Sequence, residues 1–338
     1  MKISLISVIS EPLLLIIFLL IILFSSKTFP QKIIPRDTSY TIYSAYQKYK
    51  KDYPFIKPVN FDKAKSKISL NTVSYVTYGK RKLFLDIFYK GKGTDTGKDK
   101  NKPAIIMIHG GGWRSGDRSL MYPFAAHLAE SGYIAIPVEY RLSPEIQYPA
   151  AVNDINNAIM WIRTHSYKYR IDTNHIAILG CSAGGQLASL VGLKYGNYNG
   201  NSGKVIKGIN AIVNIDGLMD FTSAEARKYE DDPSKKITSA GAWFGGRYNE
   251  KKELWKDASP IFYIKKNSPP ILFINSSVPR FHAGRNEAVT KLKSYSIYYK
   301  VETFKDAPHS FWLFDPWFKR TADYTINFLN KIFKTREK

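Results

Sequence analysis

Residues 180–185, with the sequence GCSAGG, place a serine where it could act as a nucleophile. The run before them, 175–179 (HIAIL), is predicted as a short buried strand, and the run after them, 186–190 (QLASL), opens a predicted helix. A G-x-S-x-G motif between a strand and a helix is the nucleophile elbow, a turn so sharp that the serine backbone is strained. We therefore predict that the Ser182 hydroxyl attacks an electrophilic carbon; an ordinary glycine-rich turn is the alternative interpretation.

A second glycine-rich stretch, residues 109–113 (HGGGW), directly follows another predicted strand, 104–108 (AIIMI). Glycines at this point let the backbone turn so that amide N–H groups point into the site. The N–H groups of Gly111, Gly112 and Ala183 are predicted to bind the oxyanion of a tetrahedral intermediate. A phosphate-binding loop is the rival interpretation, but the chain has neither a G-x-x-x-x-G-K-[ST] nor a G-x-G-x-x-G pattern.

A serine nucleophile needs a histidine to remove its proton, and the chain has six histidines. We predict His309 as this base, because residues 305–312 (KDAPHSFW) follow the last predicted strand in a loop that can reach Ser182. His282 is the competing candidate, and His109 is expected to brace the glycine loop. The remaining three are expected to be structural: His127, His165 and His175.

Composition favours one large domain with a sizeable core, since 44% of the 338 residues are hydrophobic. Cys181 is the only cysteine, so no internal disulfide can form, and we expect its side chain to be a small buried filler. The formal net charge of +22 fits either a lysine-rich surface or attraction to a polyanion. No basic run interleaved with aromatic residues indicates a nucleic-acid-binding module.

Residues 1–27 carry the features of a targeting segment. Lys2 gives a positive start, and residues 12–24 (PLLLIIFLLIILF) form an apolar run that suits a signal peptide better than a full membrane span. We predict a signal peptide or an uncleaved membrane anchor, with the chain exported to the periplasm, the outer surface or the medium. Residues 28–67 are then expected to form an N-terminal arm with one helix, and residues 68–335 the catalytic domain.

The elements that must position these side chains alternate along the chain. Near-continuous apolar strands separated by helices predict an α/β fold, with a mostly parallel eight-stranded sheet covered on both faces and preceded by an antiparallel hairpin. A long irregular insertion is expected over the strand ends at residues 222–266. Beyond the strands named above, the predicted strands are 69–78, 83–89, 133–139, 209–215, 271–274 and 298–304, and the predicted helices are 121–131, 153–167 and 321–333.

The motifs HGGGW and GCSAGG resemble the esterase–lipase branch of the α/β-hydrolase superfamily, over about residues 68–333. Residues 140–151 (YRLSPEIQYPAA) and 279–285 (PRFHAGR) resemble secreted bacterial carbohydrate esterases, such as feruloyl, acetyl and pectin esterases. The resemblance implies a serine esterase that hydrolyses carboxylic esters through an acyl-enzyme, without metal or cofactor. Its substrate would be an ester-decorated polysaccharide such as pectin or xylan; a lipase or small-ester hydrolase, and a non-catalytic polyanion-binding protein, are the alternatives.

The acid of the triad stays open at this point. Members of this fold usually carry it after the seventh strand, but residues 275–280 (NSSVPR) contain no carboxylate. We predict Asp216, which follows the preceding strand, as some members of the fold place their acid there. Glu287, Asp220 and Glu225 remain alternatives.

Four further side chains are candidates for substrate binding: Trp113, Arg280, His282 and Arg285. A guanidinium group pairs with a carboxylate through two hydrogen bonds, so Arg280 and Arg285 would suit an anionic sugar such as galacturonate. Both arginines could instead pair with acids of the fold.

Overall fold

The computed structural model describes residues 37–91, 101–194, 197–199 and 205–334. The predicted targeting segment and the first residues of the arm lie outside these ranges. The chain from Arg36 onward groups into one compact unit. Among the described residues no helix has both the length and the apolar character needed to cross a membrane.

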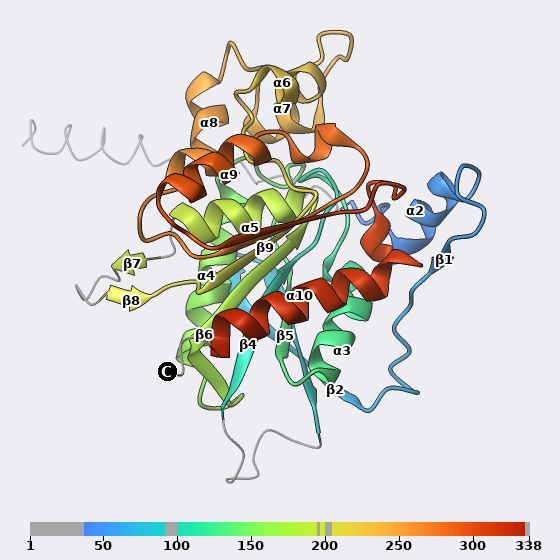
Figure 1. Cartoon of the computed structure of the whole chain (residues 1–338), viewed down its shortest axis with the longest axis vertical. Coiled ribbons are helices and arrows are strands. Elements are labelled where there is room, and N and C mark those ends of the chain that lie inside the picture. Colours follow the sequence, from blue (N-terminus) through green and yellow to red (C-terminus); the bar gives the residue numbers. More distant parts are fainter. Residues whose placement is uncertain (1–36, 92–100, 195–196, 200–204, 335–338) are drawn as a thin grey trace, which may run out of the picture. The chain divides into compact units, whose positions relative to one another are not determined.

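The unit is built on eight strands, which are, in chain order, β2 (Ile68–Tyr78), β3 (Arg81–Lys90), β4 (Lys102–Ile108), β5 (Ile134–Val138), β6 (Ile171–Cys181), β9 (Ala211–Ile215), β10 (Ile271–Asn275) and β11 (Tyr299–Thr303). They form one sheet in the order β11-β10-β9-β6-β4-β5-β3-β2 (Figure 1). The pairs from β11 to β5 are parallel, whereas β3 pairs antiparallel with β5 and with β2. The predicted α/β fold, mostly parallel with an N-terminal antiparallel hairpin, is therefore confirmed.

Alternate residues of the central strands feed two hydrophobic cores, because successive strand side chains point to opposite faces of a sheet. In β4, Ala104, Ile106 and Ile108 join one core, while Ile105 and Met107 join the other. Helices cover both cores, so the strands are apolar on both faces (Figure 1). The first core is covered by α4 (Ala150–Thr164) and α5 (Ala183–Lys194), and the second by α3 (Tyr122–Glu130) and α10 (Trp317–Lys334).

The segment between β9 and β10 is more regular than the sequence predicts. It contains three short helices that lie above the carboxyl ends of the parallel strands in Figure 1: α6 (Ala224–Glu230), α7 (Ser239–Phe244) and α8 (Lys252–Asp257). The Ser223 side chain accepts from the Ala226 N–H at the start of α6, and Thr238 caps α7 in the same way. Helices of six or seven residues are too short to show a periodic apolar pattern, so the expectation of an irregular insertion was wrong here.

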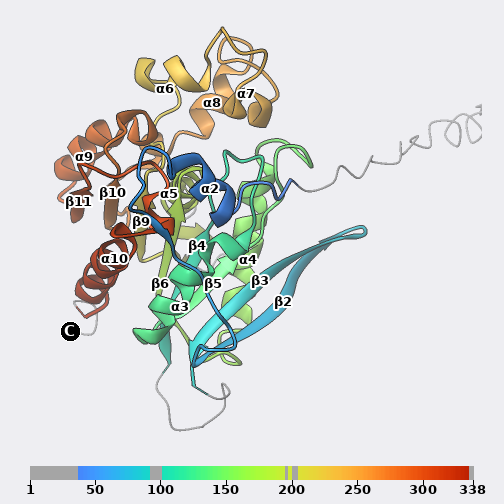
Figure 2. The ribbon, with the colours of Figure 1, turned by 90° about the vertical axis from the view of Figure 1, so that its right-hand side faces the viewer.

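The N-terminal arm packs near the same strand ends (Figures 1 and 2). Its helix α2 (Ile42–Tyr49) begins at Thr41, whose side chain forms a capping box with Ser44. Figures 1 and 2 show α2 beside the carboxyl ends of the parallel strands. After α2, the short strand β1 (Lys57–Pro58) pairs antiparallel with β12 (Phe314–Asp315). The arm thus joins the segment between β11 and α10.

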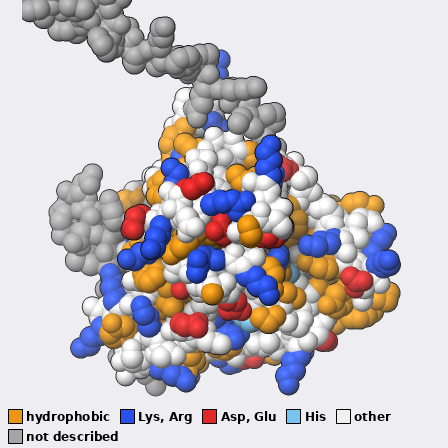
Figure 3. Space-filling model, turned by 90° about the horizontal axis from the view of Figure 1, so that it is seen from above, with side chains coloured by type: hydrophobic (Ala, Val, Ile, Leu, Met, Phe, Trp, Pro, Cys, Tyr) orange, Lys and Arg blue, Asp and Glu red, His pale blue; other side chains and the backbone are white. Residues whose placement is uncertain are grey.

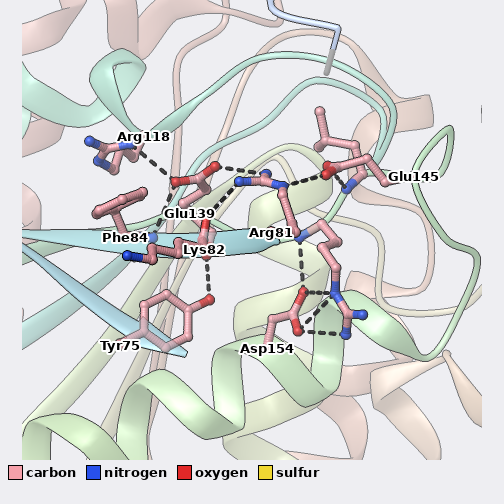
Figure 4. Close-up of polar contacts among 10 residues, drawn as sticks. Tyr75, Arg81, Lys82, Phe84, Arg118, Glu139, Glu145 and Asp154 are labelled. Atoms are coloured by element: carbon pink, nitrogen blue, oxygen red, sulfur yellow. Dashed lines mark hydrogen bonds and ion pairs between the residues drawn. The ribbon is translucent and has the colours of Figure 1, made fainter. Parts of the chain in front are cut away.

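A network of buried ion pairs fixes the β2–β3 hairpin to the loop after β5 (Figure 4). Arg118 donates to Asp86 on β3 and to Glu139, and both carboxylates are buried. Arg81 on β3 donates to Glu139 at 2.8 Å and to Glu145 at 2.7 Å. Because each arginine joins two acids, the network ties three separate segments together.

The remaining described elements are small. Strands β7 (Asn197–Asn199) and β8 (Val205–Lys207) form a separate antiparallel pair. Short 3-10 helices join other elements: η1 (Arg118–Met121), η2 (Pro260–Tyr263), η3 (Pro279–His282) and η4 (Phe311–Leu313).

Candidate active site

Ser182 occupies a tight turn between β6 and α5. Its φ angle of 56° lies in the left-handed region, which non-glycine residues rarely adopt, and its N–H donates to the Ile215 carbonyl at 2.8 Å. A Cβ atom on Gly180 would lie 1.9 Å from the Gly184 carbonyl oxygen. Only glycine therefore allows the strand and the helix to approach so closely, and the strained turn is held by its surroundings.

A chain of hydrogen bonds links Ser182, His309 and Asp216. The His309 Nε2 atom lies 2.8 Å from the Ser182 Oγ, and His309 Nδ1 lies 2.9 Å from an Asp216 carboxylate oxygen. The other oxygen of Asp216 accepts from the Ser276 N–H at 2.8 Å, which fixes the carboxylate. Asp216 follows β9 directly, and its φ of 49° is again left-handed. The strand ends thus bring together a hydroxyl, an imidazole and a carboxylate in the order that activates a serine.

The other three candidate acids lie elsewhere. Glu287 is exposed in the first turn of α9 (Arg285–Ser294), and Glu225 is exposed in the first turn of α6. Asp220 accepts from the backbone and hydroxyl of Thr222. Among the described residues, Asp216 is the carboxylate that hydrogen-bonds to His309.

The surroundings keep His309 ready to accept a proton. Burial lowers the pKa of His309 from its ordinary value of 6.5, the hydrogen bond and charge of Asp216 oppose this, and the positive charges of Arg280 and Lys48 lower it further. The imidazole is therefore uncharged at neutral pH. Burial raises the pKa of the Cys181 thiol well above its ordinary value, so this neighbour of Ser182 stays protonated. Its side chain is buried, in agreement with the expectation that it fills space in the core.

Backbone N–H groups are available beside Ser182. Gly111 and Gly112 have φ angles of 127° and 59°, and the Gly111 carbonyl accepts from the N–H of Ser115 at 3.0 Å, which closes the turn. A Cβ on Gly111 would lie 2.0 Å from the Ser115 carbonyl oxygen, so the turn requires glycine. Within the described residues the N–H groups of Gly111, Gly112 and Ala183 donate to no protein acceptor, and all three residues line one pocket with Ser182. They can receive a negatively charged oxygen.

The pocket has a volume of about 290 Å³ and draws on segments far apart in the sequence. Beyond the triad and the glycine loop, its lining includes residues of the arm, the insertion and the loop after β10: Tyr40, Lys48, Tyr49, Glu230, Arg280 and Phe281. The Phe281 ring stacks on the His309 imidazole, with centroids 3.3 Å apart. No group of three or more His, Cys, Asp or Glu side chains in the described part of the chain could hold a metal ion.

Two of the four candidate substrate-binding residues line this pocket, and two do not. Trp113 and Arg280 are part of the lining, with the Trp113 ring stacked on Trp243 at 5.0 Å. Arg285 is not: one of its guanidinium nitrogens donates to the Asn275 side chain at 2.8 Å. His282 is also outside the lining, where burial lowers its pKa. The structure therefore brings Trp113 and Arg280 to the pocket beside Ser182 and leaves Arg285 and His282 outside its lining.

His109 lies against the glycine loop, and the N-terminal arm lines the pocket. His109 stacks on Tyr140 at 4.5 Å, and its Nδ1 lies 2.7 Å from the Gly110 carbonyl oxygen, so it braces the glycine loop as predicted. No sequence pattern indicated that Tyr40, Lys48 and Tyr49 would line the pocket. These residues line the pocket together with residues more than 200 positions later in the sequence, such as His309. No local sequence pattern encodes a contact between residues so far apart in the chain.

Comparison with known proteins assigns the chain to a family. The BD-FAE family model matches residues 85–280, which is more than half of the chain. The chain belongs to the BD-FAE family. This BD-FAE protein also lies in the esterase–lipase branch of the α/β-hydrolase superfamily, as the sequence motifs indicate.

Curated relatives of this BD-FAE protein are named as esterases. Esterase LipC of Mycobacterium tuberculosis is 31% identical over 186 residues, which cover 53% of this chain and 44% of LipC. The probable carboxylic ester hydrolase LipM of the same organism is 29% identical over 224 residues, covering 65% of this chain and 48% of LipM. The chain thus spans about half the length of these relatives.

Solved structures share the fold of this BD-FAE protein at lower sequence identity. The esterase Est2 of Thermogutta terrifontis has a TM-score of 0.62 and 20% identity, and the match covers 78% of this chain and 92% of Est2. Esterase B of Lactobacillus rhamnosis has a TM-score of 0.65 and 18% identity, with 88% of this chain and 95% of that chain covered. These matches support the α/β-hydrolase fold.

Proposed function

We propose that this BD-FAE protein is a serine esterase that hydrolyses carboxylic esters through an acyl-enzyme. The proposal rests on one observation above all, the hydrogen-bonded chain from Asp216 through His309 to Ser182. Its support is the set of unpaired N–H groups beside Ser182 and the esterase names of the relatives LipC and LipM. In this proposal Ser182 is the nucleophile, His309 the general base and Asp216 the group that orients the imidazole.

The first half-reaction forms the acyl-enzyme. The Ser182 Oγ attacks the ester carbonyl carbon while His309 Nε2 takes the hydroxyl proton, and the carbonyl oxygen becomes an oxyanion. The N–H groups of Gly111, Gly112 and Ala183 donate to that oxygen, and loss of one such donor typically lowers the rate by about 10² to 10³. The tetrahedral intermediate then collapses, the carbon–oxygen bond to the alcohol breaks, and His309 protonates the departing alkoxide.

The second half-reaction releases the acid and restores the enzyme. His309 takes a proton from water as the water oxygen attacks the acyl carbon, and the same N–H groups hold the second oxyanion. Collapse breaks the bond to Ser182, whose oxygen receives the proton from His309. Asp216 keeps the imidazole in one orientation throughout and stabilises its charged form.

The substrate in this proposal is an ester carried on a polysaccharide, such as pectin or xylan. Support comes from the resemblance of residues 140–151 and 279–285 to carbohydrate esterases, and from a fold neighbour in Bacteroides eggerthii that is a bifunctional GH43-CE protein. That neighbour has a TM-score of 0.60 and 23% identity. Aromatic and cationic side chains line the pocket, which suits a sugar ring better than a long acyl chain.

A substrate panel tests the proposal. The purified protein is incubated with methylated pectin, acetylated xylan, feruloylated arabinoxylan and 4-nitrophenyl esters, and released methanol, acetate, ferulate and nitrophenol are quantified against a Ser182→Ala blank. Release from a polysaccharide that needs Ser182 is the expected result. Turnover of 4-nitrophenyl esters alone would instead make the protein a small-ester hydrolase, and polyanion binding without any turnover would make it a binding protein.

We further propose that the chain is exported, with residues 1–27 acting as a signal peptide or a membrane anchor. Fractionation of the source cells with N-terminal sequencing of the mature protein tests this. A mature terminus after residue 27 in the periplasm or medium would support a cleaved signal peptide, and an intact terminus in the membrane fraction would support an anchor. An intact terminus in the cytoplasmic fraction would contradict export.

A further inference from the structure

The pocket around Ser182 is lined by basic side chains that the proposed reaction does not use. Three basic side chains line it: Lys48 from the arm, Arg114 from the glycine loop and Arg280 from η3. Arg114 acts on the nearby carboxylate of Asp37, whose pKa it helps to lower. Within the described residues, neither Lys48 nor Arg280 forms an ion pair or a hydrogen bond with an acid of the protein. The charges of Lys48 and Arg280 are therefore available to bind a ligand in the pocket.

Arg280 is held by aromatic rings instead of by an acid. Its guanidinium carbon lies 4.2 Å from the centroid of the Phe281 ring and 5.2 Å from that of Tyr229. A cation–π contact orients the guanidinium plane and leaves its N–H donors, which lie in that plane, free to bind an acceptor. Phe281 also stacks on His309, so one ring contacts both the Arg280 guanidinium and the imidazole of the proposed base. Arg280 and Ser182 line the same pocket.

Two acids also line the pocket, Asp216 and Glu230. The Asp216 carboxylate accepts from His309 and from the Ser276 N–H. Glu230 is half-buried, and burial raises the pKa of its carboxyl, although Arg280 and Lys235 oppose the shift. Glu230 lies beyond ion-pair distance of Arg280 in the described structure. Neither acid forms an ion pair with Arg280 or Lys48, so both cations can still bind a negatively charged ligand that enters the pocket.

We propose that Arg280, assisted by Lys48, binds a carboxylate of the substrate, so that the scissile ester belongs to an anionic molecule. The proposal rests on the proposed esterase function for the position of the ester. Arginine suits this task because its planar fork binds a carboxylate through two hydrogen bonds, while lysine acts as a point charge. The face seen from above, on the side of the insertion, carries many Lys and Arg side chains and fewer acids, which favours the approach of anions (Figure 3).

The carboxylate can come from either side of the ester, and the two sources are separable. On the alcohol side it would belong to a uronic acid that carries an O-acyl group. On the acyl side it would be the second carboxyl of a dicarboxylic acid. The matching ligands are the methyl glycoside of galacturonic acid and the succinate monoester of methanol, each compared with its primary amide, which has nearly the same shape and no charge.

Binding is measured first, because it does not depend on turnover. Isothermal titration calorimetry of the Ser182→Ala variant with these four ligands should show that one carboxylate binds about tenfold to a hundredfold more tightly than its amide, the usual strength of a charge-assisted hydrogen bond. Adding Arg280→Gln should remove this preference, and Lys48→Gln should reduce it several-fold. Lys266→Gln, which removes one charge from an exposed lysine before β10, is the matched control and should leave the preference intact. Equal binding of carboxylate and amide would overturn the proposal.

Kinetics then separates this proposal from the proposed function. The ratio of kcat/KM for an O-acetylated galacturonoside and its amide, and for 4-nitrophenyl hydrogen succinate and its amide, should match the binding preference and fall toward one in Arg280→Gln. Hydrolysis with a ratio near one would refute the carboxylate subsite and leave the esterase proposal standing. Selective carboxylate binding without any hydrolysis would refute the esterase and leave the subsite standing.

Discussion

The Tyr40 hydroxyl lies 2.9 Å from the Ser310 Oγ, which joins the N-terminal arm to the residue after His309 across 270 positions of sequence. Two further contacts hold the same segments together, the β1–β12 pair and a 3.0 Å hydrogen bond from the Val59 N–H to the Leu313 carbonyl. The Asp37 carbonyl in turn accepts from the Gly116 N–H at 3.0 Å, just after the glycine loop. The arm therefore contacts both the loop that carries His309 and the loop that offers the N–H groups.

Replacing Tyr40 by phenylalanine should loosen the histidine loop. The change removes one partly buried hydrogen bond, which contributes about 1 kcal/mol, so kcat should fall by up to about fivefold with KM little changed. Steady-state kinetics on a 4-nitrophenyl ester measures both. Tyr43→Phe is the matched control, because Tyr43 lies three residues further along the arm, in the first turn of α2, with 69% of its surface exposed. Equal kinetics for the two variants would contradict a positioning role for Tyr40.

Replacing Asp216 by asparagine should abolish most activity while leaving the fold intact. The amide cannot hold His309 in the orientation and tautomer that accepts the Ser182 proton, and the corresponding change in a well-studied serine protease lowers kcat by about 10⁴. Asp220→Asn and Glu287→Gln are the controls, since neither side chain reaches His309, and both should retain near-normal kcat. A larger loss in either control than in Asp216→Asn would assign the acid elsewhere.

The pH dependence of kcat/KM should have an acid limb set by His309. Protonated His309 cannot accept a proton from Ser182, so activity is lost as pH falls through its pKa. Because burial and neighbouring cations lower that pKa, activity should persist below pH 6.5 before it declines. Removing a cation should raise the pKa, so Arg280→Gln should move the limb to higher pH, while Lys266→Gln should not. A limb that moves to lower pH in Arg280→Gln would contradict this electrostatic account.

The buried pair of Asp154 and Arg141 should matter more for stability than any surface pair. Asp154 is fully buried and accepts three hydrogen bonds from the Arg141 guanidinium, at 2.8, 2.9 and 3.2 Å (Figure 4 shows Asp154). Asp154→Ala leaves a largely buried cation without its partner, which should lower the free energy of unfolding by about 3 kcal/mol or more. Asp323→Ala, which breaks an exposed pair with Lys319, should cost less than about 0.5 kcal/mol. Urea denaturation measures both, and equal losses would contradict the prediction.

Local sequence patterns predicted much of the frame of the site. The elbow around Ser182 and the turn at Gly111 each require glycine within a few residues of a buried strand, so their spacing is visible in the sequence. The near-continuous apolar strands likewise predicted the sheet, because every central strand is buried on both faces. His309 and Asp216 could be nominated from their places after predicted strands, since parallel strands end at one edge of a sheet.

The rest of the pocket could not be predicted, because it depends on contacts without a local pattern. Tyr40 and Lys48 reach the site from the arm, and only the packing of α2 brings them there. Arg280 and Arg285 are five residues apart and chemically equivalent in the sequence. The turn η3 sends the first into the pocket and leaves the second on Asn275, a difference that no composition or spacing encodes.

Covalent labelling of the nucleophile tests the central claim most directly. The folded protein is treated with a fluorophosphonate, and intact-mass and peptide mass spectrometry locate the adduct. A single adduct on Ser182, absent in Ser182→Ala and strongly slowed in His309→Ala, is the predicted result, because only a serine activated by its neighbouring imidazole reacts with this reagent at neutral pH. An adduct on another residue, or none on the folded protein, would contradict the account.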